Sequence, residues 1–118
     1  LTSIFFGGGT PSLMRPTTVE KIIQEAIQLW PVADTLEITL EANPNSVEVN
    51  AFQALSQAGV NRISIGIQAL HDQALKNLGR QHSVKEGIQA IETACQTFQR
   101  VSFDLIYARP DQTVEQWR

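Results

Sequence analysis

Four apolar segments of strand length alternate along the sequence with segments of helical periodicity. The strands are predicted at residues 3–6, 36–41, 62–68 and 101–107. Helices are predicted within residues 17–30, 46–58 and 83–98, and from residue 113 onward. Two neighbouring parallel strands need a long crossover, usually a helix, and such crossovers are right-handed. This order therefore predicts an α/β fold in which all strands are parallel.

Capping residues set the predicted starts of the helices. Thr17 or Thr18 is predicted to cap the first helix, and Ser46 is predicted to cap the second. Ser83 and Glu86 have the spacing of a capping box, so the third helix is predicted to begin there.

Polar and apolar residues alternate within the strands. This pattern distinguishes a parallel sheet that helices cover on both faces from one that they cover on a single face. In the second strand the apolar face carries Leu36, Ile38 and Leu40, and the other face carries Glu37, Thr39 and Glu41. Strands that helices cover on both faces are apolar nearly throughout. We therefore expect four β/α units that form a partial (β/α) TIM-like barrel arc, with the polar face inside. Alternatively, the polar face is exposed by truncation or covered by a missing partner.

Three consecutive glycines, at residues 7–9, follow the first strand and precede Thr10, Pro11 and Ser12. Such a run loses much backbone entropy on folding, so a close approach of bare backbone to a ligand is the usual reason for it. The sequence around it has neither the lysine of a P-loop nor the dinucleotide-binding spacing. It indicates a binding loop for a small molecule, the alternative being a tight turn that binds nothing.

Charged and polar side chains that could bind a ligand lie where the other strands end. Glu41, Gln68 and Asp104 lie toward the carboxyl ends of the second, third and fourth strands, and Arg80 follows a glycine after the third. Barrel enzymes collect their working groups at this edge. Each residue also has a structural alternative: Glu41 as a cap of the next turn, Asp104 as a buried carboxylate bonded to a loop amide, and Arg80 as a surface charge.

Together these groups suit a zwitterionic ligand that also carries hydroxyls. Glu41 and glycine-loop carbonyls could bind an ammonium group, and Arg80 could bind a carboxylate through two hydrogen bonds. Gln68 and Asp104 could hold ribose hydroxyls. An amino acid attached to a nucleoside meets this description.

Composition excludes several classes of protein. The net charge of −3 gives no basic surface for nucleic acid, and no apolar run approaches the roughly 20 residues that span a bilayer. The single cysteine, Cys95, is expected on the core face of its helix and fits a reducing cytoplasm. Neither His71 nor His82 has partners at a metal-ligand spacing, so we predict no metal ligand and no catalytic side chain.

Five motifs in order resemble one known family over essentially the whole sequence. They are residues 5–12 (FFGGGTPS), 39–44 (TLEANP), 59–68 (GVNRISIGIQ), 78–83 (LGRQHS) and 103–107 (FDLIY). The sequence is similar to the radical S-adenosylmethionine enzymes related to oxygen-independent coproporphyrinogen III oxidase. It most resembles their heme-chaperone subgroup.

This resemblance implies S-adenosylmethionine as a ligand and assigns roles to seven residues. Gly8, Gly9 and Thr10 would bind its methionine part, Glu41 and Arg80 its amino-acid end, and Gln68 and Asp104 its ribose. The resemblance further implies a [4Fe–4S] cluster in the parent protein, and heme or a porphyrinogen as its partner.

The family's Cys-x3-Cys-x2-Cys motif is not among these residues, and residues 108–113 depart from the glycines common in the family. We therefore expect residues 1–118 to be part of a core domain, inactive alone, with the cluster loop upstream and further strands and a C-terminal domain downstream. Two functional alternatives stay open: a true coproporphyrinogen III oxidase that decarboxylates its substrate oxidatively, and a non-catalytic half-barrel binding module.

Overall fold

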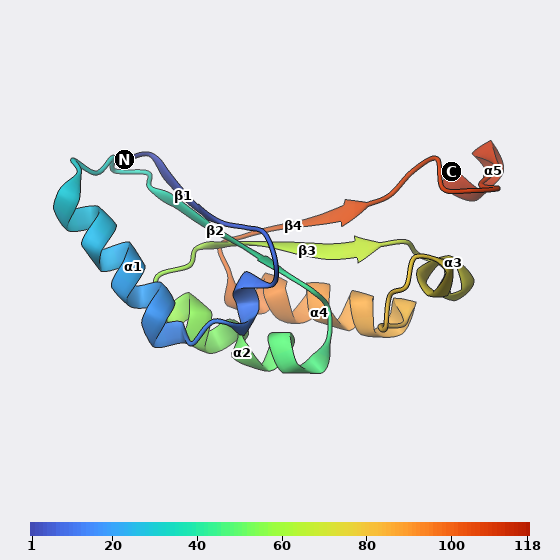
Figure 1. Cartoon of the computed structure of the whole chain (residues 1–118), viewed down its shortest axis with the longest axis horizontal. Coiled ribbons are helices and arrows are strands. Elements are labelled where there is room, and N and C mark those ends of the chain that lie inside the picture. The colour runs from blue at the N-terminus through green and yellow to red at the C-terminus, as the bar shows by residue number, and fades with distance from the viewer.

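The computed structural model describes all residues, 1–118, and has the predicted alternation of strands and helices (Figure 1). Its elements are β1 (Ser3–Phe6), a 3-10 turn η1 (Pro11–Leu13), α1 (Pro16–Leu29), β2 (Glu37–Ala42), α2 (Ser46–Gln57), β3 (Arg62–Gln68), α3 (Asp72–Asn77), α4 (Val84–Thr97), β4 (Arg100–Leu105) and α5 (Val114–Trp117). The third strand has its predicted bounds. The second is shifted by one residue, and the fourth ends two residues early.

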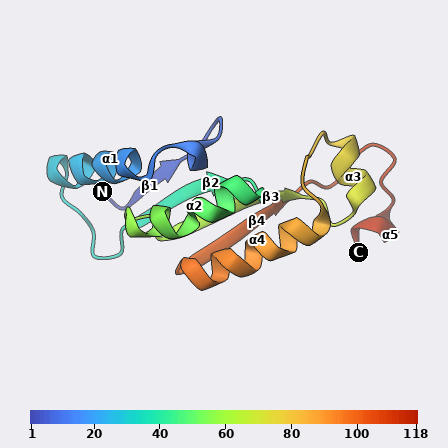
Figure 2. The same cartoon turned by 90° about the horizontal axis from the view of Figure 1, so that it is seen from below.

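The four strands form one parallel sheet in the order β1-β2-β3-β4. Phe6 pairs with Leu40, Leu40 pairs with Ile63, and Ile63 pairs with Val101. Helices α1, α2 and α4 all lie on one face of this sheet (Figures 1 and 2). A doubly wound sheet carries helices on both faces, whereas a barrel carries them on the outside only. The predicted barrel arc is therefore confirmed.

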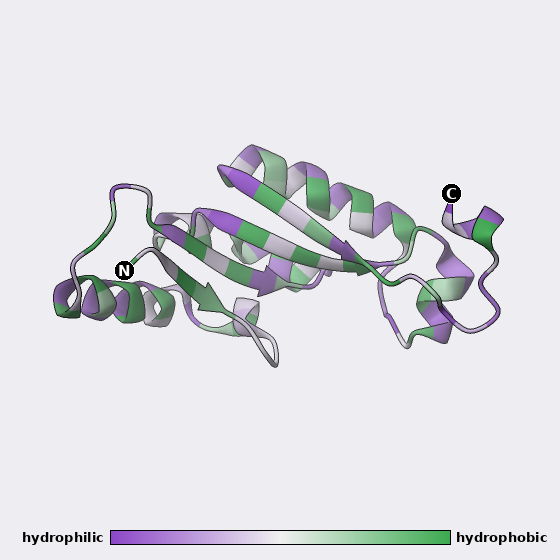
Figure 3. Cartoon of the chain, turned by 90° about the horizontal axis from the view of Figure 1, so that it is seen from above, coloured by the Kyte–Doolittle hydropathy of each residue, from purple (hydrophilic) through white to green (hydrophobic).

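The core lies between the sheet and these helices. Fifteen buried apolar residues form one cluster, in which Ile63, Ile65 and Ile67 of β3 all point to the helices. The rings of Phe52 and Phe98 meet edge to face at a centroid distance of 5.6 Å. Hydrophobic and hydrophilic residues alternate visibly along β2, β3 and β4 (Figure 3), as the period of a half-covered strand requires.

Two of the predicted helix caps are wrong. Helix α1 begins at Pro16, before Thr17 and Thr18, and its cap position is Arg15 without a side-chain bond. Proline lacks an N–H and has a helical φ, so it starts a helix without a capping side chain. Helix α2 is capped by Asn45, whose side chain accepts from the backbone N–H of Glu48. The capping box of Ser83 is confirmed.

The buried face of α4 also differs from the prediction. Gly87, Ala90 and Ala94 are buried, whereas Cys95 is exposed. Small residues let the helix approach the sheet closely: a Cβ at Gly87 would lie 3.4 Å from Ile67. No helix has the length and apolar character that crossing a membrane requires.

Candidate binding site

A cavity of about 210 Å³ lies at the carboxyl edge of the sheet. Its lining residues are Gly9, Thr10, Pro11, Glu41, Ala42, Asn43, Ser64, Gly66, Gln68, Arg80 and Asp104. It therefore brings together six of the seven residues singled out in the sequence. The seventh, Gly8, is hydrogen-bonded to Glu41. Ligand sites typically enclose about 300–1,000 Å³, so this cavity has room for one part of a nucleoside-bearing molecule.

The glycine loop presents bare backbone beside this cavity. Gly8 and Gly9 have φ angles of 77° and 59°, in the left-handed region that glycine adopts without strain. No atom lies within 4 Å of where a Cβ would be at either position, so their backbone is open to approach. The Gly8 N–H donates to Glu41 Oε2 at 3.2 Å, which fixes the loop against the end of β2.

Gln68 enters the cavity through an irregularity of β3. Its φ is 71°, and the β3–β4 register shifts between Ile65 and Gln68. A left-handed conformation is uncommon outside glycine, and bulges often redirect a side chain next to a functional site. The Gln68 amide folds back over Gly66, so that Nε2 lies 2.8 Å from the position of a Cβ there. Gly66 thus makes room for the Gln68 side chain.

Arg80 reaches the cavity from the connection that follows α3. Gly79 turns the chain with a φ of 69°, and the Arg80 N–H donates to the Leu75 carbonyl at 2.9 Å. The Arg80 Nη1 donates to Asn43 Oδ1 at 3.3 Å, and Arg80 forms no ion pair. Its remaining guanidinium N–H groups are therefore available to an anion.

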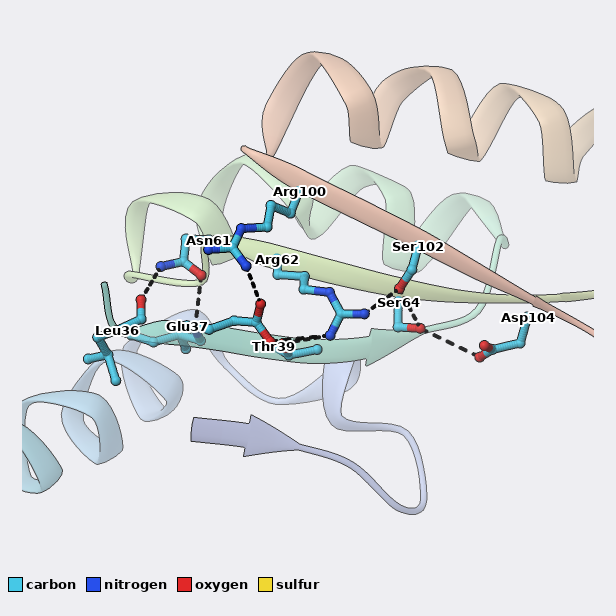
Figure 4. A network of polar contacts seen from close by, with 10 residues as sticks. Leu36, Glu37, Thr39, Asn61, Arg62, Ser64, Arg100, Ser102 and Asp104 are labelled. Atoms are coloured by element: carbon cyan, nitrogen blue, oxygen red, sulfur yellow. Dashed lines mark hydrogen bonds and ion pairs between the residues drawn. The ribbon is translucent and has the colours of Figure 1, made fainter. Parts of the chain in front are cut away.

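Asp104 ends a chain of polar contacts along the face of the sheet opposite the helices (Figure 4). Glu37 pairs with Arg100 at 2.6 Å and with Arg62 at 3.3 Å, near the amino ends of the strands. Arg62 also donates to Ser102 at 3.1 Å. Ser102 in turn donates to Ser64, and Ser64 donates to Asp104 at 3.5 Å. In order along the sheet, the residues of this row are Arg100, Glu37, Arg62, Ser102, Ser64 and Asp104. This row confirms that one face of the sheet is polar.

The structural alternative for Asp104, a buried carboxylate bonded to a loop amide, is wrong. Asp104 is exposed because β4 has a neighbouring strand on one side only. Two further polar side chains of the lining were not predicted. They are Asn43, which directly follows β2, and Ser64 of β3. Asn43 follows the strand-end Glu41 by two residues, so the pattern that found Glu41 could have included it.

The two histidines do not join the cavity. His82 Nε2 lies 3.1 Å from the Ile67 carbonyl oxygen, and His71 lies near the connection to α3. No three His, Cys, Asp or Glu side chains are grouped closely enough to hold a metal ion.

A parallel β/α arc with a polar cavity at the carboxyl ends of its strands places this chain in the class of β/α-barrel-type domains. The family described as "Radical SAM superfamily" matches residues 1–118, the whole chain. The chain belongs to the radical SAM superfamily, as the resemblance predicted.

Individual relatives agree with this assignment. The chain is 45% identical over 116 residues to the mitochondrial "Radical S-adenosyl methionine domain-containing protein 1" of Bos taurus, covering 98% of the chain and 26% of that protein. It is 41% identical over 115 residues to the "Heme chaperone HemW" of Escherichia coli strain K12, covering 97% of the chain and 30% of that protein. The chain thus spans between a quarter and a third of these relatives.

A solved structure supports the fold. Coproporphyrinogen III oxidase (HemN) from Escherichia coli superposes with a TM-score of 0.82 at 24% identity, over 99% of the chain and 27% of that protein. At this identity the likeness shows the fold alone. Several relatives are named as mitochondrial, so the cytoplasmic location expected from the cysteine content stays a prediction.

Proposed function

We propose that this chain binds the methionine end of S-adenosylmethionine within the radical SAM core of a longer heme-handling protein. The observation that carries the proposal is the single cavity lined by Gly9, Thr10, Glu41 and Arg80, with the Gly8 N–H bonded to Glu41. The Glu41 carboxylate suits an ammonium group, and the free guanidinium donors of Arg80 suit a carboxylate.

The ribose is assigned to the other side of the cavity. Gln68 offers an amide that both donates and accepts, and Asp104 offers a carboxylate that accepts from hydroxyls. The open backbone at Gly8 and Gly9 allows a ligand to approach closely. The residues present therefore fit this ligand. When bound, S-adenosylmethionine supplies radical chemistry, while the protein supplies binding and orientation.

A [4Fe–4S] cluster does not fit the residues of this chain. Such clusters are held by several cysteine thiolates, and the one cysteine, Cys95, is exposed on α4 behind the sheet. We propose that residues 1–118 form part of the core domain. In this proposal the cluster loop lies upstream, and further strands and a C-terminal domain lie downstream. This chain alone is then inactive.

Heme is proposed as the cargo because relatives named "Heme chaperone HemW" are up to 41% identical to this chain. A heme titration of the full-length protein, run beside a coproporphyrinogen III decarboxylation assay, tests this. We expect heme binding without decarboxylation. Decarboxylation would instead assign the oxidase function. If the protein shows neither heme binding nor decarboxylation, a non-catalytic module is favoured. In that case the gene should also lack an upstream cysteine triplet.

Binding of S-adenosylmethionine is tested by calorimetry on the full-length protein after cluster reconstitution. Glu41→Gln is expected to weaken binding about tenfold or more, corresponding to at least about 1.4 kcal/mol. Glu92→Gln removes an exposed carboxylate on α4 and serves as the matched control, with unchanged affinity expected. Equal affinities of the two variants would refute the assignment of Glu41.

A further inference from the structure

Glu48 is a buried carboxylate that the proposed binding scheme does not use. It lies in the first turn of α2 and is 2% exposed, and neither ion pair in the structure involves it. A buried charge is costly unless hydrogen bonds compensate it. The N-terminal end of a helix favours a negative charge, but this effect is modest. Its compensation must come from hydrogen-bond donors.

Those donors come from two loops at the carboxyl edge of the sheet. Glu48 Oε2 accepts from the Asn43 N–H at 2.6 Å and also from the Ser12 hydroxyl. Oε1 accepts from Asn45 Nδ2 at 2.5 Å and from Asn43 Nδ2 at 3.2 Å. Ser12 belongs to the segment after the glycine loop, and Asn43 directly follows β2. One carboxylate thus joins the loops that follow β1 and β2.

These contacts also orient a residue of the cavity. Because the Asn43 Nδ2 is held by Glu48, the Asn43 Oδ1 is directed away from Glu48 and accepts from Arg80 Nη1 at 3.3 Å. Ser12 is 2% exposed and adjoins Pro11, which lines the cavity. Glu48 therefore contacts the turn after the glycine loop directly, at Ser12, and reaches Arg80 through one intermediate residue, Asn43.

Helix capping alone does not account for this arrangement. In a capping box the side chain at this position bonds the backbone N–H of the cap residue. Here the cap is Asn45, and the Glu48 carboxylate bonds the Asn45 side chain, the Asn43 backbone and Ser12. Two of these partners lie outside the helix and its cap.

We propose that Glu48 is a positioning residue, which holds the glycine loop and the Asn43–Arg80 pair at the spacing that the ligand requires. The inference rests on the proposed S-adenosylmethionine site. Glu48 touches no ligand in this scheme, so its effect on affinity acts through Ser12 and Asn43.

The test compares three variants of the reconstituted full-length protein. Glu48→Gln turns an amide N–H₂ toward one pair of donors, and Ser12→Ala removes only the contact to η1, the turn that follows the glycine loop. Asn61→Ala is the control: its side chain accepts from the Ile38 N–H and donates to the Leu36 carbonyl, both at 2.8 Å, at the opposite end of β2 (Figure 4). All three lose hydrogen bonds of a partly or fully buried side chain and should melt at lower temperatures.

Calorimetric affinity for S-adenosylmethionine distinguishes positioning from a general loss of stability. We expect Glu48→Gln to weaken binding about tenfold and Ser12→Ala about threefold, whereas Asn61→Ala binds as the wild type does. Hydrogen exchange without ligand should quicken in residues 8–13 and 43–45 for the first two variants only. Ser12→Ala keeps the test decisive if Glu48→Gln fails to fold.

Two outcomes overturn the inference. One is wild-type affinity in Ser12→Ala and Glu48→Gln despite lowered melting temperatures, which leaves the proposed function intact. The other is local exchange that does not differ from that of Asn61→Ala. A wild-type protein that does not bind S-adenosylmethionine would refute the proposed function instead, and the exchange measurement would still decide whether Glu48 fixes the two loops.

Discussion

The Gly8 N–H donates to Glu41 Oε2 at 3.2 Å and so connects the glycine loop to the end of the neighbouring strand. Gly8 makes this bond with a φ of 77°. The loop and the carboxylate are 33 residues apart in the sequence, and the parallel pairing of β1 with β2 brings them together. The geometry of the glycine loop is therefore set jointly by its own backbone freedom and by Glu41.

Gly8→Ala is expected to destabilise the fold. A Cβ has open space there, so the cost is the left-handed backbone itself, about 1–2 kcal/mol for an L-residue. Urea unfolding measures the loss. Gly8→Asn is the matched variant, because asparagine tolerates this conformation, and it should lose less stability. If both variants lost the same free energy of unfolding, the left-handed backbone conformation would not be the cause of the loss.

Gly66→Ala is expected to displace the Gln68 side chain. The added Cβ would lie 2.8 Å from Gln68 Nε2, the mobile end of that side chain, so the amide moves while the strand stays in place. We predict a several-fold loss of affinity for S-adenosylmethionine with little change in melting temperature. Calorimetry on Gln68→Ala and on the double variant provides the control. Additive losses would contradict a shared cause.

The amino end of α4 should show a pH dependence that originates in Glu86. The Ser83 backbone N–H, at 2.7 Å, and then the Ser83 hydroxyl, at 2.8 Å, lower the pKa of Glu86 below its ordinary value of 4.5. A lowered folded-state pKa stabilises the fold above the ordinary value, and this contribution is lost as the pH falls through the lowered pKa.

Carbon-detected NMR titration of the Glu86 carboxyl measures this effect. Ser83→Ala removes the hydroxyl but keeps the backbone donor, so the pKa of Glu86 should rise part of the way toward 4.5. Thr113→Ala removes the other capping box, at α5, and should leave the Glu86 titration unchanged. The same Glu86 pKa in the wild type and in Ser83→Ala would rule out the hydroxyl as a cause.

The convergence of the site could be predicted because it follows from local patterns. The carboxyl ends of parallel strands meet at one edge, so Glu41, Gln68 and Asp104 had to lie near one another once the strands were identified. The fold followed from the same periodicity. Neither inference needed any side-chain contact between distant segments.

The contacts that fix the site could not be predicted in this way. Glu48 lies in the first turn of a helix, where an exposed carboxylate is common, yet it is buried and accepts a hydrogen bond from Ser12, 36 residues away. Cys95 was assigned to the core face because apolar spacing was counted, whereas the buried face of α4 is built from glycine and alanine. Pro16 likewise made a capping threonine unnecessary.

We propose above all that the amino-acid end of S-adenosylmethionine lies against Glu41 and Arg80. Calorimetry on the full-length protein with Arg80→Ala tests it, using S-adenosylmethionine and 5′-methylthioadenosine, which lacks the amino-acid group. With the ligand placed in this way, Arg80→Ala should weaken binding of S-adenosylmethionine about tenfold or more and leave binding of 5′-methylthioadenosine unchanged. An equal effect on both ligands, or none on either, would contradict it.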